Sequence, residues 1–111
     1  MPTAYSVLNR MLTDGVKFTA LFVPSDTMAM AAMKAIGDFG LRVPDDISVI
    51  AIDGLQVSEY ITPTLTTMVQ PAEEMGRKSV RILVDVLEGK GRTKHLRVEA
   101  KIREGASVKP L

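Results

Sequence analysis

The chain of 111 residues has no cysteine and no tryptophan, and it contains one histidine. Without cysteine it has no disulfide, no thiolate zinc site and no cysteine nucleophile, and the composition fits a reducing compartment. No Gly-rich phosphate-binding loop is present, and His95 falls in an expected surface turn. Asp26 and Asp53 follow expected strands, but the sequence offers them no histidine or cysteine for acid–base or metal chemistry. We therefore expect no catalytic activity, no metal site and no cofactor.

Long apolar runs and a large net charge are also missing. No run approaches the roughly 20 residues of a membrane-spanning helix, and no N-terminal signal pattern is visible. We therefore expect a cytoplasmic protein without a membrane partner. The net charge of +1 gives no electrostatic reason for nucleic-acid binding. Basic residues gather near the end of the chain without aromatic residues to stack on bases, which favours a solvated turn and a protected edge strand. They are Lys90, Arg92, Lys94, Arg97, Lys101 and Arg103.

What the sequence does contain is an alternation of short apolar runs and helical patterns. Continuous apolar runs are typical of strands buried on both faces of a parallel sheet. The last apolar stretch alternates with charged residues, which predicts an edge strand with one face in water. The alternation predicts an α/β fold, a parallel-sheet layer with flanking helices and right-handed crossovers. Helices are expected over residues 4–13, 26–39 and 71–87, and strands over 19–23, 47–52, 65–69 and 96–102.

The expected helix over residues 71–87 is amphipathic. Glu73 with Arg77, and Glu74 with Lys78, have the four-residue spacing of favourable pairs on an outer face. The opposite face is apolar and should be covered by a sheet or by a partner. That face comprises Ala72, Met75, Ser79, Ile82, Leu83, Val86 and Leu87.

The expected helix over residues 26–39 differs, because methionine and alanine leave it almost no polar face in its first turns. Two interpretations stay open. The helix can lie between two layers of its own domain, or it can form a subunit interface in which flexible methionines fill the gaps.

Polar residues stand at the ends of the three buried runs: Ser25, Asp53 and Gln70. The carboxyl ends of parallel strands line the ligand crevice of an open α/β sheet, so these side chains should converge. A carboxylate accepts two hydroxyl hydrogen bonds, which suits neighbouring sugar hydroxyls or a ribose, and an amide both donates and accepts. The alternatives are local: Asp53 can satisfy its own turn, Gln70 can bond to the next helix, and Ser25 can cap one.

These motifs closely resemble the effector domain of lac repressor/galactose repressor family transcription regulators. Ser25-Asp26 before the Met-Ala helix, Asp53 after its strand, and Leu65-Thr-Thr-Met-Val-Gln70 match that family's pattern over about residues 5–107. Departures occur where the family often has aromatic or acidic residues, so an effector that depends on those groups is not expected. The departing residues are Ala51, Ile52, Gly54 and Ala72.

The resemblance implies a partial periplasmic-binding-protein-like (type I) domain. Residues 1–111 would form the C-terminal segment of the effector domain, with 4–70 in the C-terminal lobe, 71–89 an N-lobe helix and 95–103 a returning strand. Ser25, Asp53 and Gln70 would contact the effector, and Asp26 is a further candidate, although a helix-cap role is favoured for it. The resemblance also places a homodimer interface on the Met-Ala helix and the following loop, at Met28, Ala29, Met30, Met33, Tyr60 and Ile61.

The function that follows is ligand sensing for a transcriptional regulator, with a sugar-like or nucleoside-like effector and with DNA contacted only through a headpiece absent from this chain. Two alternatives are a fragment of a solute-binding protein for sugar uptake and a dimerisation fragment that binds no ligand.

Overall fold

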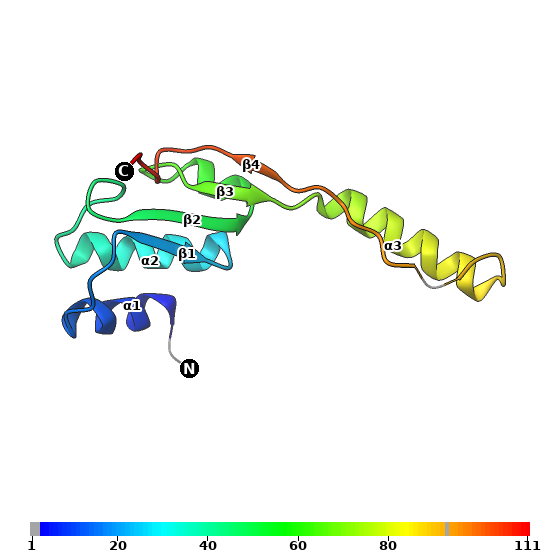
Figure 1. Ribbon diagram of the computed structural model, residues 1–111, viewed down its shortest axis with the longest axis horizontal. Helices are drawn as coiled ribbons and strands as arrows, with labels where there is room; N and C mark the ends of the chain where they lie inside the picture. Colours follow the sequence, from blue (N-terminus) through cyan, green and yellow to red (C-terminus); the bar gives the residue numbers. More distant parts are fainter. Residues whose placement is uncertain (1–2, 93) are drawn as a thin grey trace. The chain divides into compact units, whose positions relative to one another are not determined.

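The computed structural model describes residues 3–92 and 94–111. It divides into a first unit, the chain up to Val69 together with Ile102–Leu111, and a second unit, Gln70–Lys101. The assignment of these units to two lobes of a larger domain stays a prediction. In chain order the elements are α1 (Ala4–Thr13), β1 (Ala20–Val23), α2 (Asp26–Asp38), β2 (Ser48–Asp53), the 3₁₀ helix η1 (Gln56–Glu59), β3 (Thr66–Val69), α3 (Ala72–Leu87) and β4 (Lys101–Arg103) (Figure 1).

The sheet has the strand order β1-β2-β3-β4, and β2 pairs in parallel with both β1 and β3. The register places Val23 beside Ala51 and Ala51 beside Thr67. Because alternate residues of a strand point to opposite faces, these residues share one face of the sheet. All three are buried. The predicted α/β class with a parallel sheet is therefore confirmed.

Helix α2 contacts α1 as well as β1 and β2, so it lies between a helix and the sheet (Figure 1). Ala29, Ala32 and Ala35 are buried in this layer. Their small side chains recur on one face of the helix and allow close approach to its neighbours. One side of α2 thus lies between two layers of its own domain, while the interpretation of its methionines as a subunit interface stays a prediction. The core around it consists of Leu8, Leu12, Val23, Ala29, Ala32, Ala35, Ile36, Ile47, Val49, Ala51 and Leu65.

The expectation that β1 is buried on both faces is wrong. Phe22 has 60% of its surface exposed, although the neighbouring Val23 is buried. The reason is that β1 is an edge strand and that Phe22 points away from the face on which Val23 and Ala51 are buried. A continuous apolar run therefore marks a strand here without showing how many of its faces this chain covers.

The edge position of the last strand is confirmed, but its predicted length is wrong. The sequence predicts a strand over residues 96–102, and β4 spans only Lys101–Arg103. Alternating polarity describes a half-buried ribbon, whereas a strand also needs a neighbour to accept its hydrogen bonds. Its neighbour β3 is itself only four residues long, Thr66–Val69, and offers no partner for the longer segment.

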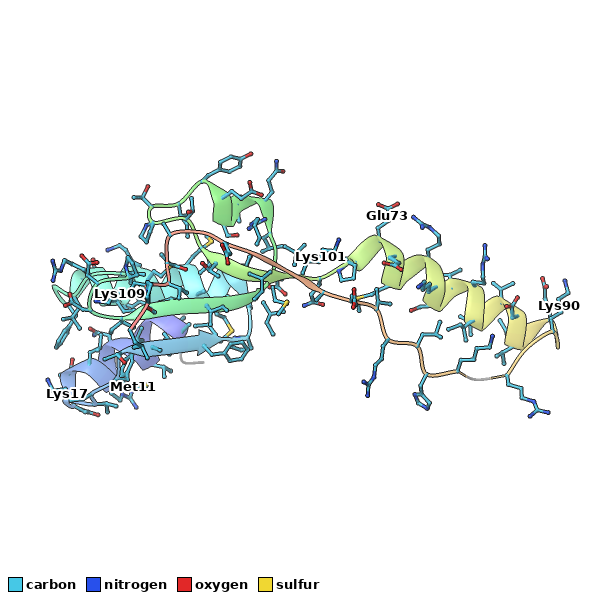
Figure 2. The ribbon with its side chains drawn as sticks, turned by 45° about the horizontal axis from the view of Figure 1, so that its top comes forward. Met11, Lys17, Glu73, Lys90, Lys101 and Lys109 are labelled. Carbon is cyan, nitrogen blue, oxygen red and sulfur yellow. The ribbon has the colours of Figure 1, made fainter. Side chains whose placement is uncertain are left out.

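Helix α3 begins one residue later than predicted and ends as predicted. It has the predicted ion pairs, with distances of 2.8 Å between Arg77 and Glu73 and 2.9 Å between Lys78 and Glu74. Figure 2 shows its side chains, with Glu73 labelled in its first turn. The expected cover for its apolar face is not found within the described residues, because none of its side chains is buried and Leu87 is 76% exposed. Among the described residues, no helix is long and apolar enough to cross a membrane.

A small polar cluster joins α1 to α2. The Tyr5 hydroxyl donates to Asp38 Oδ2 at 2.8 Å, and Lys34 Nζ pairs with Asp38 Oδ1. The hydrogen bond from Lys34 has the larger effect and that from Tyr5 the smaller, and together they hold the pKa of Asp38 below its ordinary value of 3.8.

A group with a depressed folded pKa stabilises the fold above its ordinary pKa and ceases to do so as the pH falls through the folded value. We therefore expect Asp38→Asn to lower the urea midpoint modestly at pH 7 and to have no effect in acid well below pH 3.8. Urea titrations of both proteins across this range test it. A difference that persists unchanged in strong acid contradicts the assignment.

Candidate functional site at the carboxyl end of β2

The turn after β2 has an unusual backbone. Asp53 has a φ of 151°, a value that residues with a side chain rarely adopt, and Gly54 follows with a φ of 78°. A Cβ on Gly54 would lie 2.7 Å from Val69 Cα, so a glycine is needed there for space as well as for conformation. Strained backbone of this kind persists where the surrounding structure holds it, and it is frequent at binding sites.

The structure brings Asp53 to the start of α2. Asp53 Oδ2 accepts a hydrogen bond from the backbone N–H of Asp26 at 3.2 Å. Ser25 occupies the N-cap position with an extended backbone, but its side chain makes no capping hydrogen bond. Ser25 is therefore the N-cap residue by position, but the Asp53 carboxylate, and not the Ser25 side chain, accepts a hydrogen bond from the helix N-terminus. Ser25 is half-buried beside this contact.

Asp26 is fully buried. Its Oδ2 accepts from the Leu55 N–H at 2.8 Å and from the Ser58 hydroxyl at 3.0 Å, and its Oδ1 accepts from the Thr67 hydroxyl. Buried carboxylates persist when protein donors replace water in this way. Asp26 therefore braces the turn from inside and has no exposed surface with which to contact a ligand.

Arg103 contacts the same turn from β4. Its guanidinium donates to the carbonyl oxygens of Gly54 at 3.3 Å and Leu55 at 3.0 Å, to the Ser58 hydroxyl, and to Glu59 Oε1 at 2.9 Å. Its side chain is only 25% exposed. Arg103 lies on the edge strand β4, but its guanidinium contacts the turn instead of lying in solvent. In the sequence, the only indication of this contact is that Arg103 directly follows the alternating segment 96–102.

Gln70 directly follows β3 and belongs to the second unit. Its carbonyl accepts from the Ala72 N–H at 2.9 Å, at the start of α3. The convergence of Gln70 with Ser25 and Asp53 stays a prediction. Within the described residues, no three histidine, aspartate or glutamate side chains are grouped so as to hold a metal ion.

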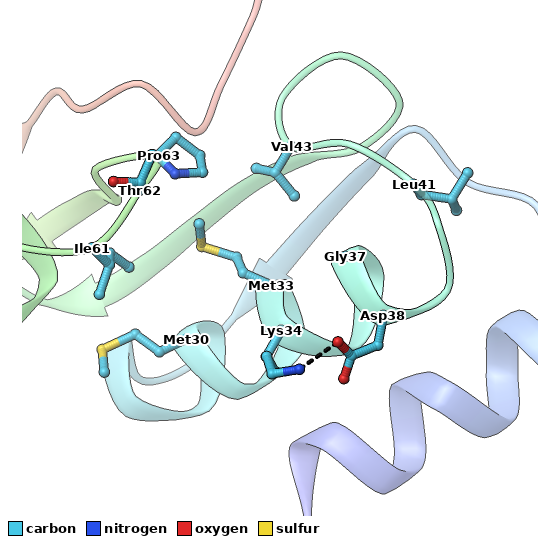
Figure 3. Close-up of a pocket in the computed structure, with 10 residues that line it drawn as sticks. All are labelled: Met30, Met33, Lys34, Gly37, Asp38, Leu41, Val43, Ile61, Thr62 and Pro63. Atoms are coloured by element: carbon cyan, nitrogen blue, oxygen red, sulfur yellow. Dashed lines mark hydrogen bonds and ion pairs between the residues drawn. The ribbon is translucent and has the colours of Figure 1, made fainter.

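The residues expected at a dimer interface fall into two groups. Ala29 is fully buried in its own core, so it cannot contact a partner, whereas Met28 and Tyr60 are exposed. Met30, Met33 and Ile61 line a groove of about 340 Å³ along one side of α2 (Figure 3). The rest of that groove is formed by Lys34, Gly37, Asp38, Leu41, Val43, Thr62 and Pro63.

Comparison with known proteins identifies the group to which this architecture belongs. Residues 2–108 match the model of the periplasmic binding protein-like domain. The chain belongs to this family. The chain is 39% identical over 102 residues to the HTH-type transcriptional regulator MalR of Clostridium butyricum, covering 92% of this chain and 30% of MalR.

Two solved structures extend the comparison. The crystal structure of the lac repressor dimer bound to operator and the anti-inducer ONPF gives a TM-score of 0.89 at 31% identity, over 95% of this chain and 37% of that one. A LacI family transcriptional regulator from Arthrobacter sp. FB24 in complex with lactose gives a TM-score of 0.82 at 27% identity, over 96% and 40% of the two chains. The resemblance expected from the motifs is confirmed. The chain spans about a third of the length of these relatives, which are transcriptional regulators.

Proposed function

We propose that this chain is the ligand-sensing part of a transcriptional regulator and that it binds a small sugar-like or nucleoside-like effector noncovalently. The observation that carries the proposal is the Asp53 turn, where a strained backbone presents a carboxylate at the carboxyl end of β2. The relatives add support, since one lac repressor structure holds a small molecule and the Arthrobacter regulator holds lactose.

The proposed site consists of polar side chains that form hydrogen bonds with hydroxyl groups of the ligand. Asp53 accepts from neighbouring hydroxyls of a sugar or a ribose, with Ser25 beside it, and Gln70 supplies a mixed donor and acceptor. Ala51, Ile52 and Ala72 provide no aromatic ring, so stacking from these positions contributes nothing to recognition. Asp26 stays outside the contact set because protein donors surround it.

In this proposal the regulator acts in the cytoplasm as a homodimer without catalysis, and a headpiece outside this chain contacts DNA. Effector binding then shifts the population between two domain states. The solute-binding alternative has weaker support, because the relatives are transcriptional regulators.

In a gel-shift assay at physiological salt, we expect the isolated chain not to retard DNA. Sequence-dependent retardation of DNA by the isolated chain would contradict the proposal that only the headpiece contacts DNA.

A thermal-shift panel tests the proposed function on the complete polypeptide that the gene of this chain encodes. The probes are lactose, glucose, ribose, adenosine and guanosine, with sorbitol at equal concentration as the control for nonspecific stabilisation. A ligand that binds only the folded state raises the melting temperature in proportion to its occupancy. A shift from one sugar or nucleoside supports the proposal, and no shift from any of them contradicts it.

Asp53→Asn should weaken binding of the active panel compound about tenfold to a hundredfold, because it removes a charge-assisted hydrogen bond worth roughly 1.5–3 kcal/mol. The amide keeps an oxygen for the α2 cap, so the fold should change little. Calorimetry on the complete polypeptide measures the affinity, with Asp14→Asn, an exposed carboxylate after α1, as the matched control. Gln70→Ala should cost less. Unchanged affinity in Asp53→Asn means that this carboxylate serves only its turn.

Met30→Lys should weaken self-association of the chain, because it places a charge in the apolar groove beside Met33 and Ile61. Sedimentation velocity measures the effect, and Val7→Lys on α1 is the control, since Val7 is a 47% exposed apolar residue outside the proposed interface. A folded wild-type chain that is purely monomeric, or equal weakening by both substitutions, contradicts the placement.

A further inference from the structure

The turn that carries Asp53 is held on both sides of its backbone. The N–H groups of Gly54 and Leu55 donate to Thr67 Oγ1 at 3.3 Å and to Asp26 Oδ2 at 2.8 Å. The carbonyl oxygens of the same two residues accept from Arg103, at 3.3 Å and 3.0 Å, and that of Leu55 also accepts from the Ser58 N–H at 3.1 Å. Every backbone polar group of Gly54 and Leu55 is therefore engaged, and one side chain, Arg103, supplies a donor to both carbonyls.

Arg103 also reaches the buried carboxylate behind the turn through one intermediate. It donates to the Ser58 hydroxyl, whose single proton has two acceptors, Asp26 Oδ2 at 3.0 Å and the Leu55 carbonyl oxygen at 2.7 Å. The chain of contacts runs from a cation on β4 through a hydroxyl to a fully buried anion. A planar guanidinium can fill this role because its donors point in fixed directions, whereas a lysine ammonium is a single point charge.

We propose that Arg103 is a positioning residue for the Asp53 site. It acts through the Gly54–Leu55 backbone and holds the strained turn in the conformation that presents the Asp53 carboxylate. As a role in ligand binding, this inference rests on the proposed function.

Arg103 lies next to the residue at which the chain returns to the first unit. The chain re-enters the first unit at Ile102, one residue before Arg103. The guanidinium thus ties the point of re-entry to the turn that carries Asp53.

Amide hydrogen exchange measured by NMR on this chain tests the positioning role without any ligand. In Arg103→Met, we expect exchange at Gly54 and Leu55 to rise about tenfold or more relative to the buried Ala35 of α2. Arg103→Lys should give an intermediate rise. Glu59→Gln is the matched control, since it alters one partner of Arg103 without touching the two carbonyl contacts, and it should leave these amides nearly unchanged.

Two results would overturn the inference. One is an equal rise at Ala35 and at the turn, which would mean that Arg103 only stabilises the fold. The other is a turn as protected in Arg103→Met as in the wild type. If Arg103→Met does not fold, Arg103→Lys decides alone: wild-type protection at Leu55 overturns the proposal, and a rise confined to the turn supports it.

A second measurement addresses ligand binding in the complete polypeptide. Arg103→Met should weaken binding of the active panel compound about tenfold although Asp53 is intact, and Glu59→Gln should not. Unchanged affinity beside a loosened turn removes the role in binding. If no panel compound binds the wild type, the proposed function fails, while the exchange experiment still decides whether Arg103 holds the turn.

Discussion

Gly54→Ala should destabilise the first unit by about 2–5 kcal/mol. The φ of 78° places an alanine in the left-handed region, which costs roughly 1–2 kcal/mol. The new Cβ would also lie 2.7 Å from Val69 Cα, and such overpacking adds typically about 1–3 kcal/mol because the contacted atom is backbone and cannot rotate away. Urea unfolding followed by circular dichroism measures the loss.

Gly40→Ala separates the two contributions. Gly40 has a φ of 88°, close to that of Gly54, but a Cβ at Gly40 would meet no heavy atom within 4 Å. We therefore expect this control to lose only the conformational part, about 1–2 kcal/mol. Equal losses at the two glycines would show that the approach to Val69 carries no cost.

Asp26→Asn should cost about 1–3 kcal/mol for each buried donor that it leaves without an acceptor. The asparagine amide has the shape of the carboxylate but no charge. Its NH₂ group can only donate hydrogen bonds, so it cannot accept from the donors that surround this position. Those donors are the Leu55 N–H and the hydroxyls of Ser58 and Thr67. The unfolding free energy from urea titration at pH 7 is the measurement.

Asp14→Asn is the matched control for this substitution. Asp14 is an exposed aspartate at the end of α1, and surface changes of this kind usually stay within about 0.5 kcal/mol. If Asp26→Asn is as harmless as this control, the buried carboxylate contributes little to the turn. The positioning network that includes Ser58 and Arg103 would then need another anchor.

Local patterns determined most of the secondary structure. The expected helix over residues 4–13 matches α1, and the expected helices over 26–39 and 71–87 each differ from α2 and α3 by one residue. Helical spacing and stop signals lie close together in the chain, so they are readable without knowledge of its partners. The same holds for Asp53, because a polar residue directly after a buried strand must lie at the sheet edge. The sequence also predicted Ser25 beside Asp53, since both follow neighbouring parallel strands.

Tertiary structure decided which of these residues face water and which hold the site. Asp26 and Arg103 lie 77 positions apart in the sequence. Ser58 forms a hydrogen bond with each of them, and this is possible because β4 lies next to β3 in the sheet. Phe22 is exposed because it points away from the face that carries α2. Burial and long-range hydrogen bonds depend on which elements meet across the sheet. A local pattern identifies an apolar or charged residue, but it does not specify what covers it.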